Sequence, residues 1–383
     1  MLVENKKIGI VGGGPGGLTL ARLLQNKGLT VKVYERDLNP EVRVQGATLD
    51  LHHDSGLKAL EKAGLLDAFK SQYRPGADRI RILDEHGRIH FDQHNENTEE
   101  TFGDPWFRPE IDRGPLRKLL LESLKPNTVE WNSHILSLER SGAGWQIKGQ
   151  NGTFAYADIV IAADGANSKV RPFLTSIRPF YTGVTALEGT IYDAAARAPY
   201  MTKLVQGGKI FAFGDSKTLI VSAKGDGSLS FYTGFKVALQ DNDRKINTGN
   251  KAQIANWFEQ EYAGWNPMWQ ELFVHPDTDY VLRPLFCMPL DQSWEAQSNI
   301  TMLGDAAHLM PPYAGEGVNM AMLNALELSQ ALTSLNFPDV RMAIAYYEEQ
   351  MLKNFRNAAA MSLENTEWMH APGGLQQMLQ MFK

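Results

Sequence analysis

Apolar and polar positions divide the chain into two kinds of segment. Near both ends, short apolar runs precede stretches with helical periodicity. Strands are predicted at 7–11, 30–34, 158–163 and 299–303, and helices at 18–26 and from 318 onward. Strands that alternate with helices in this way indicate a parallel sheet covered by helices.

The middle third has a different pattern, in which short apolar runs are separated by glycine-containing turns. Strands are predicted at 209–213, 218–223 and 228–235, and a hairpin is predicted at 79–91 around Gly87. Strands joined by short turns indicate an antiparallel sheet, which we expect to be inserted between the parallel parts. A long helix is predicted at 340–361.

The composition narrows the class of protein. Of 383 residues, 43% are hydrophobic and 21% are charged, and the net charge is −6, so neither nucleic acid nor an anionic membrane surface is an expected partner. Cys287 is the single cysteine, which excludes an internal disulfide and any Cys-cluster metal site, and we expect it in the core. The sequence contains no recognisable signal peptide and no apolar stretch long enough for a membrane span, so we expect a cytoplasmic protein. We also expect a monomer.

A glycine-rich loop directly follows the first predicted strand. Gly12, Gly14 and Gly17 fit the spacing G-x-G-x-x-G, and Glu35 follows the second strand 18 residues after Gly17. Bare backbone amides at the amino end of a helix stabilise a pyrophosphate, and an acid at about this spacing suits a ribose hydroxyl. These features predict a dinucleotide site in a Rossmann-like fold, with Arg36 in reach of an adenosine or phosphate group.

Two more acidic turns follow predicted strands. Asp164 comes after the strand at 158–163, and Asp305 comes after the strand at 299–303. Pro312 then stiffens the chain, while Gly315 and Gly317 allow the backbone to approach a flat or anionic group closely. Because open α/β sheets bind ligands at the carboxyl ends of their strands, we expect both turns to face one cofactor.

The histidine-rich segments do not predict a metal site. His52-His53-Asp54 lacks further ligands at a useful spacing and is expected near the start of a helix. His86, His90 and His94 recur every four residues, but the hairpin pattern scatters their side chains. We therefore expect no metal.

Together, the three motifs resemble those of the single-component, FAD-dependent aromatic-ring monooxygenases of the para-hydroxybenzoate hydroxylase type. The resemblance implies that the glycine loop binds the ADP end of FAD and that Asp164-Gly165 lies at FAD and the nicotinamide nucleotide. It places Asp305 on the ribityl chain and the loop after it along the flavin ring. The further cofactor-binding positions are Asp50, Arg113, Arg117, Pro312, Gly315, Gly317, Val318 and Asn319.

The resemblance also divides the chain. FAD-binding parts are expected at 1–73, 101–176 and 280–335, and parts of a substrate domain at 74–100 and 177–279. A C-terminal bridging helix is expected at 336–383.

Within this family, the chain is most similar to the tetracycline-inactivating monooxygenases. The similarity rests on segments 46–52, 109–113 and 308–312, and it implies that Arg43 takes part in NADPH binding. Where that subgroup has drug-contacting glutamine, arginine and histidine, this chain has Glu188, Lys209 and Ser230. Tyr313 keeps an aromatic ring beside the flavin, so these four residues are the candidates for contact with substrate.

The reaction implied by the resemblance depends mainly on cofactors. NADPH or NADH reduces FAD, O2 forms a flavin C4a-hydroperoxide, and one oxygen atom enters an electron-rich ring or enol. A tetracycline-like polyketide is the first candidate substrate, and its hydroxylation would inactivate the antibiotic and confer resistance. Another phenolic or polyketide compound is the second candidate, and a non-catalytic FAD-binding redox sensor is the third interpretation.

No side chain is assigned as a certain catalyst, but Glu316 stands out close to Tyr313. Relatives usually carry a neutral glutamine at this position. An ionised Glu316 near the isoalloxazine would disfavour the anionic reduced flavin, unless the carboxyl group is protonated or paired with a basic neighbour.

Overall fold

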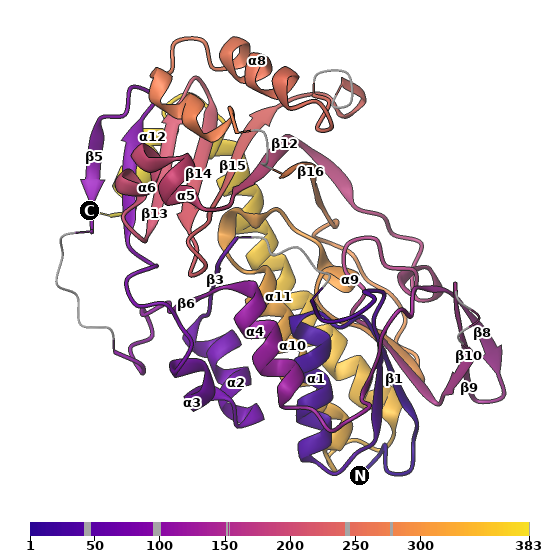
Figure 1. Ribbon diagram of the computed structural model, residues 1–383. Helices are drawn as coiled ribbons and strands as arrows, with labels where there is room; N and C mark the ends of the chain where they lie inside the picture. Colours follow the sequence, from indigo (N-terminus) through magenta and orange to yellow (C-terminus); the bar gives the residue numbers. More distant parts are fainter. Residues whose placement is uncertain are drawn as a thin grey trace.

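The computed structural model describes residues 1–41, 47–94, 101–150, 152, 154–241, 246–275 and 279–382. A lower lobe is built on a parallel sheet and an upper lobe on a mainly antiparallel sheet, and one long helix runs between them (Figure 1). The predicted fold class is therefore confirmed.

The lower lobe contains a five-stranded sheet in which all neighbouring strands are parallel, with β1 in the middle. Strands β1 and β11 are buried along their whole length, as expected where structure covers both faces of a sheet. In sheet order the strands are β17 (Ile300–Met302), β11 (Ile159–Ala162), β1 (Ile8–Val11), β2 (Val31–Tyr34) and β7 (Val129–Glu130).

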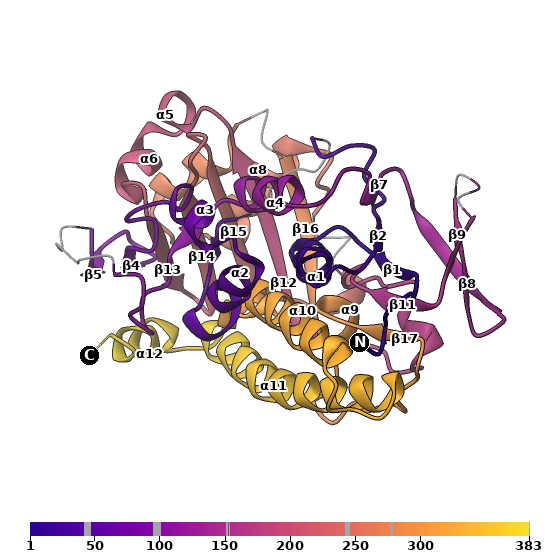
Figure 2. The same cartoon turned by 90° about the horizontal axis from the view of Figure 1, so that it is seen from below.

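Helices α1 (Pro15–Asn26) and α10 (Gly317–Thr333) pack against each other beside this sheet (Figure 2). A small three-stranded antiparallel sheet projects from the same lobe, away from α11 and α12 (Figure 2). Its strands are β8 (Ile135–Ser141), β9 (Gly144–Gly149) and β10 (Phe154–Ala157), and β9 pairs with both of the others.

The upper lobe contains a seven-stranded sheet in which only the pair β4 and β13 is parallel. Its strands, in sheet order, are β16 (Asp279–Cys287), β12 (Phe180–Ile191), β15 (Leu229–Lys236), β14 (Lys217–Ala223), β13 (Lys209–Gly214), β4 (Ile80–Asp84) and β5 (Ile89–Asp92). The predicted hairpin and the three predicted strands are thus confirmed. Strands β12 and β16 were not predicted, because glycine, threonine and charged residues interrupt their apolar pattern.

One face of the seven-stranded sheet forms a core with short helices. These are α5 (Ala194–Arg197), α6 (Pro199–Val205), α8 (Lys251–Glu261) and η4 (Pro267–Leu272). Trp257, Trp265 and Trp269 are buried in this core, and Cys287 is buried at the end of β16, as predicted. The opposite face of the sheet is turned towards the lower lobe, where Lys209 pairs with Glu110.

Helix α11 (Val340–Met369) joins the two lobes (Figure 1). Near its start, the Tyr347 hydroxyl donates a hydrogen bond of 2.8 Å to the carbonyl of Met302 in the parallel sheet. At its end, Trp368 stacks on Phe213 of the seven-stranded sheet. The helix is longer than the predicted 340–361, because contacts with the upper sheet stabilise its last turns.

The remaining elements are short and connect the two lobes or cap them. They are β3 (Leu49–Asp50) paired with β6 (Glu110–Ile111), η1 (His53–Leu57), α2 (Lys58–Ala63), α3 (Leu66–Lys70), α4 (Arg113–Glu122), η2 (Arg171–Phe173), η3 (Leu239–Asp241), α9 (Asp305–His308), η5 (Pro312–Ala314) and α12 (Gly374–Gln380).

Replacing Glu348 of α11 with glutamine is expected to stabilise the protein in alkaline solution. Glu348 is 4% exposed and accepts a 2.7 Å hydrogen bond from the Thr301 hydroxyl, and burial raises the pKa of its carboxyl to about 7. A raised folded-state pKa contributes stability at low pH that is lost as pH rises through about 7. Glu348→Gln should therefore raise the free energy of unfolding by about 2 kcal/mol at pH 8 and change it little at pH 5.

Denaturant unfolding at the two pH values measures this difference. The matched control is Glu349→Gln, because the neighbouring Glu349 is exposed on the same helix. A Glu348→Gln variant with the wild-type pH profile would contradict the prediction.

Candidate active site

Parallel strands bring the predicted loop and acidic turns to one edge of the five-stranded sheet. Strand β1 runs into Gly12, β2 into Glu35, β11 into the turn at Asp164, and β17 into the turn at Asp305. All four junctions lie at the carboxyl ends of parallel strands. This is the edge at which doubly wound sheets bind dinucleotides.

The glycine loop packs tightly at two positions and is open at the third. A Cβ at Gly12 would lie 2.2 Å from the carbonyl oxygen of Ala163, and Gly12 has a φ of 109°. A Cβ at Gly17 would lie 2.2 Å from the carbonyl oxygen of Gly12. A Cβ at Gly14 would meet no described heavy atom within 4 Å, so the space in front of the amino end of α1 is open for a phosphate group.

Glu35 shapes this loop from the end of β2. Its side chain is buried, and its Oε2 accepts a 2.6 Å hydrogen bond from the Gly13 amide. Its Oε1 accepts a 3.1 Å bond from the Asp37 amide. The predicted contact with a ribose hydroxyl stays a prediction.

Asp164 has an unused hydrogen-bond acceptor. Its Oδ2 accepts a 2.8 Å bond from the Lys169 amide, but its buried Oδ1 has no partner among the described residues. Burial raises the pKa of this carboxyl group. Since buried acceptors are almost always satisfied, a hydroxyl group of a bound nucleotide fits this position.

Arg171 holds the two acidic turns together. Its Nε donates a 2.7 Å hydrogen bond to the Ala306 carbonyl, and its Nη2 donates 3.0 Å bonds to the carbonyls of Ala166 and Asp305. The carboxylate of Asp305 is accessible to solvent, yet protein surrounds most of it, and this desolvation raises its pKa. The open space at Gly14, the unused oxygen of Asp164 and the accessible carboxylate of Asp305 therefore fit one extended nucleotide cofactor.

The loop after Asp305 is fixed from two sides. Helix α11 holds it through Ser362, which donates a 2.6 Å hydrogen bond to the Pro311 carbonyl, and through Asn365, which donates one of 2.9 Å to the Tyr313 carbonyl. The buried Asn319 side chain donates to the carbonyls of Asp50 (2.9 Å) and Gly315 (3.2 Å). Pro312 and Gly317 are exposed and Val318 is half-buried, so this part of the loop is accessible to a flat ring.

Asp50 and Glu316 lie on either side of His52. The His52 Nε2 lies 2.9 Å from Asp50 Oδ2, and its Nδ1 lies 3.3 Å from Glu316 Oε1. Glu316 therefore has a basic neighbour, which is one of the two conditions under which its charge would not oppose flavin reduction.

The predicted substrate residues Glu188, Lys209 and Ser230 share the face of the seven-stranded sheet that is turned towards the lower lobe. Lys209 forms a buried ion pair with Glu110, and Glu188 pairs with Arg283 of β16. Ser230 is 2% exposed, and its hydroxyl has no partner among the described residues.

Tyr313 connects this face to the C-terminal helix. Its hydroxyl lies 3.3 Å from Nε2 of His370, and the Thr218 hydroxyl lies 3.2 Å from the same nitrogen. The Nδ1 of His370 lies 2.8 Å from the Thr366 carbonyl, which can only accept, so Nδ1 carries the proton. Burial lowers the pKa of His370 to about 4, so Nε2 is an acceptor and Tyr313 donates to it.

The predicted arginines have different surroundings. Arg36 is exposed, and Arg43 lies outside the described residues. Arg113 is exposed at the start of α4, where its Nε donates to the Ala47 carbonyl at 3.0 Å, and its charge opposes the rise that burial causes in the pKa of Asp305. Arg117 is buried and binds Asp37 at 2.9 Å, in the loop after β2. Their contacts with a cofactor stay predictions.

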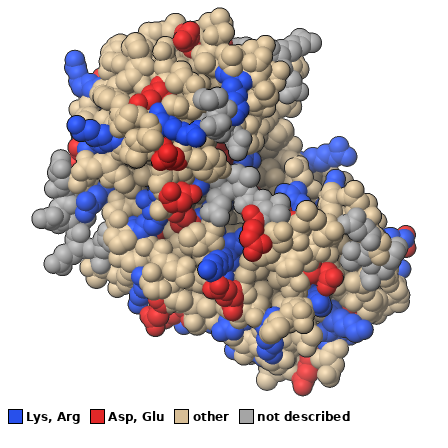
Figure 3. All heavy atoms as spheres, viewed as in Figure 1, with Lys and Arg blue, Asp and Glu red and all other residues tan. Residues whose placement is uncertain are grey.

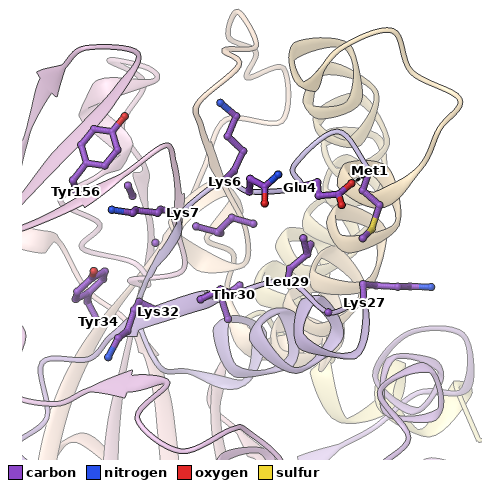
Figure 4. Close-up of a pocket in the computed structure, with 16 residues that line it drawn as sticks. Met1, Glu4, Lys6, Lys7, Lys27, Leu29, Thr30, Lys32, Tyr34 and Tyr156 are labelled. Carbon is purple, nitrogen blue, oxygen red and sulfur yellow. Dashed lines mark hydrogen bonds and ion pairs between the residues drawn. The ribbon is translucent and has the colours of Figure 1, made fainter.

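One surface hollow lies elsewhere. It has a volume of about 670 Å³ and is open at the amino ends of β1 and β2, opposite the edge that carries the glycine loop. Lys6, Lys7, Lys27 and Lys32 surround it (Figure 4). None of the predicted site residues lines this hollow, so it is not the cofactor site.

Charged side chains and potential metal ligands are dispersed over the described part of the chain. Blue basic and red acidic side chains are interspersed over the face seen in Figure 3. Among the described residues, no group of three or more His, Cys, Asp or Glu side chains is arranged to hold a metal ion. No helix in the same part of the chain is long and apolar enough to cross a membrane.

The model of a protein family described as "FAD binding domain" matches residues 5–247 and 292–337. This is most of the chain, and it contains all four junctions at the sheet edge. The chain belongs to the FAD-binding domain family. The predicted cofactor is therefore confirmed as FAD. NAD(P)H and O2 are the usual co-substrates of FAD-dependent monooxygenases.

Relatives in this family have monooxygenase names. "Monooxygenase penA" of Penicillium thymicola is 27% identical over 431 aligned residues, covering 97% of each protein. The 6-hydroxynicotinate 3-monooxygenase of Pseudomonas fluorescens is 26% identical, covering 96% of this chain and 92% of that one. The predicted enzyme class, a flavin-dependent monooxygenase, is confirmed.

A solved structure shows the same fold. The crystal structure of tetracycline destructase Tet(55) superposes with a TM-score of 0.76, covering 96% of this chain and 90% of that one. The two chains are 19% identical, so the comparison establishes the shared fold and leaves the substrate open.

Four residues of the site were not predicted. The sequence assigns no role to Glu110 or Arg171, and it places His52 only near the start of a helix and in the similar segment 46–52. Asp50 and His52 are two residues apart in an extended segment, a spacing that places both side chains on one side. No local sequence pattern indicates that His370 belongs to the site, because its partners Tyr313 and Thr218 are distant in sequence.

Proposed function

We propose that this enzyme hydroxylates a planar, electron-rich substrate that carries an acidic oxygen, with a tetracycline-like polyketide as the first candidate. The observation that supports this proposal most strongly is the position of the cationic Lys209 side chain. It lies on the sheet face opposite the loop at 312–319, which is predicted to lie along the flavin ring. Burial alone would lower the pKa of Lys209, but the carboxylates of Glu110 and Asp50 raise it. Lys209 therefore offers a charged donor to an ionised phenol, enol or carboxylate oxygen.

The surroundings of Lys209 suit a flat ring. Strand pairing places Ser222 and Ser230 in the same row of the sheet as Lys209, and Phe211, Ile220 and Tyr232 in the adjacent row. A predominantly apolar surface with a few convergent polar groups is typical of small-molecule sites. The unpartnered hydroxyl of Ser230 is a second polar contact for the substrate.

The residues of the chain bind and orient, and the cofactor supplies the redox chemistry. When bound, FAD accepts hydride from NAD(P)H and activates O2. The amides around Gly14 would hold the pyrophosphate, and Asp164 and Asp305 would accept hydrogen bonds from hydroxyl groups of the cofactor. The loop at 312–319 would hold the flavin ring, while Lys209 and Ser230 would orient the substrate and Tyr313 would exclude water.

A phenolic or heteroaromatic acid is the second candidate substrate. The name of the relative 6-hydroxynicotinate 3-monooxygenase describes a hydroxylated ring that bears a carboxylate. Lys209 would pair with such a carboxylate as well as with an enolate, so this substrate class uses the same site.

Following NADPH oxidation by the FAD-loaded protein, with and without each compound, tests both candidates. Tetracycline should stimulate oxidation and yield a product heavier by one oxygen atom. Stimulation only by hydroxybenzoates or hydroxypyridine carboxylates would replace the first candidate with the second. Bound FAD without turnover on the whole panel would contradict the proposal and favour a redox sensor.

The domain limits, the cytoplasmic location and the monomeric state stay predictions. Size-exclusion chromatography with light scattering measures the last of these.

A further inference from the structure

The His52 ring joins two carboxylates from different elements of the lower lobe. Asp50 ends β3, and Glu316 directly precedes the first residue of α10. The two ring nitrogens lie 2.9 Å and 3.3 Å from the respective carboxylate oxygens. The side chains of His52, Asp50 and Glu316 are 13%, 24% and 21% exposed, so the cluster is largely shielded from water.

When both carboxylates are ionised, this geometry requires a protonated ring. A neutral imidazole has a single N–H and can donate to only one carboxylate, whereas both nitrogens of the imidazolium are donors. The hydrogen bonds and charges of Asp50 and Glu316 outweigh the opposing effect of burial and raise the pKa of His52 to about 9. His52 is therefore cationic at neutral pH.

The other charges near the cluster act on Asp50. Lys209 of β13 and Arg108 of the segment before β6 both lower the pKa of Asp50, and Glu110 of β6 is paired with Lys209. The adjacent His53 pairs with Asp54 instead. Among the described residues, His52 is the basic group in contact with Glu316.

Neutral hydrogen bonds hold the same segments in place. The His52 amide donates a 2.9 Å bond to Asn319 Oδ1, and the Asn319 amide group donates to the Asp50 carbonyl at 2.9 Å. A variant that changes the His52 ring therefore removes a charge while this backbone connection remains.

We propose that His52 is a positioning residue that holds the Glu316 carboxylate and cancels its negative charge beside the flavin ring, and thereby raises the reduction potential of the bound flavin. The proposal rests on the predicted placement of 312–319 along that ring. A carboxylate next to the flavin disfavours the negative charge of the reduced form, and a cation paired with it removes this effect.

Charge-changing variants test the proposal through the midpoint potential of bound FAD at pH 7, measured without substrate. His52→Gln should shift the potential to a more negative value, because Glu316 loses its counter-charge. Glu316→Gln should shift the midpoint potential to a more positive value, because the His52 cation is then paired with the Asp50 carboxylate alone. The double variant should return to within error of the wild-type potential.

His53→Gln is the matched control, since His53 is adjacent, more exposed and paired with Asp54. This variant should leave the potential unchanged. FAD affinity measured for every variant separates a shift of potential from a loss of cofactor. An unchanged or more positive potential in His52→Gln, or a double variant equal to His52→Gln, would overturn the proposal.

The pH dependence provides a second readout. The difference in potential between the wild type and His52→Gln should be constant up to about pH 8 and should shrink above about pH 9, as His52 loses its proton. Nitrogen NMR of the apoprotein should show both ring nitrogens protonated at pH 7. An imidazolium in the apoprotein with equal potentials in the two holoproteins would also overturn the proposal. Because no substrate is present, failure here is distinguishable from failure of the proposed hydroxylation.

Discussion

Replacing Gly14 with valine is expected to weaken FAD binding strongly while the protein remains folded. Gly14 has φ −79° and ψ 177°, an extended conformation that valine adopts readily, and a Cβ there meets no described atom within 4 Å. The new side chain would occupy the space of the pyrophosphate and separate it from the amides of α1. Loss of two charge-assisted hydrogen bonds, about 3 kcal/mol in total, should weaken FAD binding at least about a hundredfold.

FAD fluorescence titration and circular dichroism of the apoprotein measure the two expected effects separately. Gly249→Val is the control, because Gly249 also has an unstrained backbone but lies before α8 in the upper lobe. Gly12→Ala should behave differently and fail to fold, since its Cβ would collide with the Ala163 carbonyl. If Gly14→Val bound FAD with wild-type affinity, the pyrophosphate would not lie at this loop.

Replacing Lys209 with methionine is expected to destabilise the protein, because Glu110 would remain buried without a partner. Glu110 is 1% exposed, and burial raises its pKa while Lys209 opposes that rise. Removing one member of a buried ion pair costs about 3 kcal/mol. The free energy of unfolding, measured by denaturant titration, should fall by about this amount in Lys209→Met and recover most of it in Lys209→Met/Glu110→Gln.

The stable double variant then isolates the functional role of Lys209. Its substrate-stimulated kcat/KM should be lower by at least about tenfold, the value expected when a charged hydrogen bond of about 1.5 kcal/mol is lost. Lys217→Met is the control, because Lys217 lies at the opposite end of the neighbouring strand β14, over the ring of Tyr262. Wild-type kcat/KM in the double variant would show that Lys209 is a structural residue only.

Many local features of this enzyme were predictable from the sequence. The glycine loop at 12–17 and the acidic turns at Asp164 and Asp305 were found because each depends on a few consecutive residues. A strand, a turn and the start of a helix have characteristic periodicities and turn residues, and these signals are local. Parallel pairing of β1, β11 and β17 then follows from the alternation of strands and helices.

The long strands β12 and β16 could be identified only from the tertiary structure. Glycine, threonine and charged residues interrupt the apolar pattern of β12, and a bulge lies between Tyr181 and Thr185. Their pairing places residues such as Leu187 in the core between the seven-stranded sheet and the short helices. That stabilisation comes from neighbours distant in the chain, so it leaves no clear local pattern.

The sequence by itself determined the α/β class, the three nucleotide-binding motifs and the unusual acidic residue Glu316, because these depend on residue type and short spacing. Only the tertiary structure decided what surrounds them. His52 and Glu316 are separated by most of the chain, and Lys209 and Glu110 are 99 residues apart, yet folding brings each pair into contact. Whether a buried charge has a partner depends on such long-range contacts, and that partner decides its protonation state and its effect on the flavin.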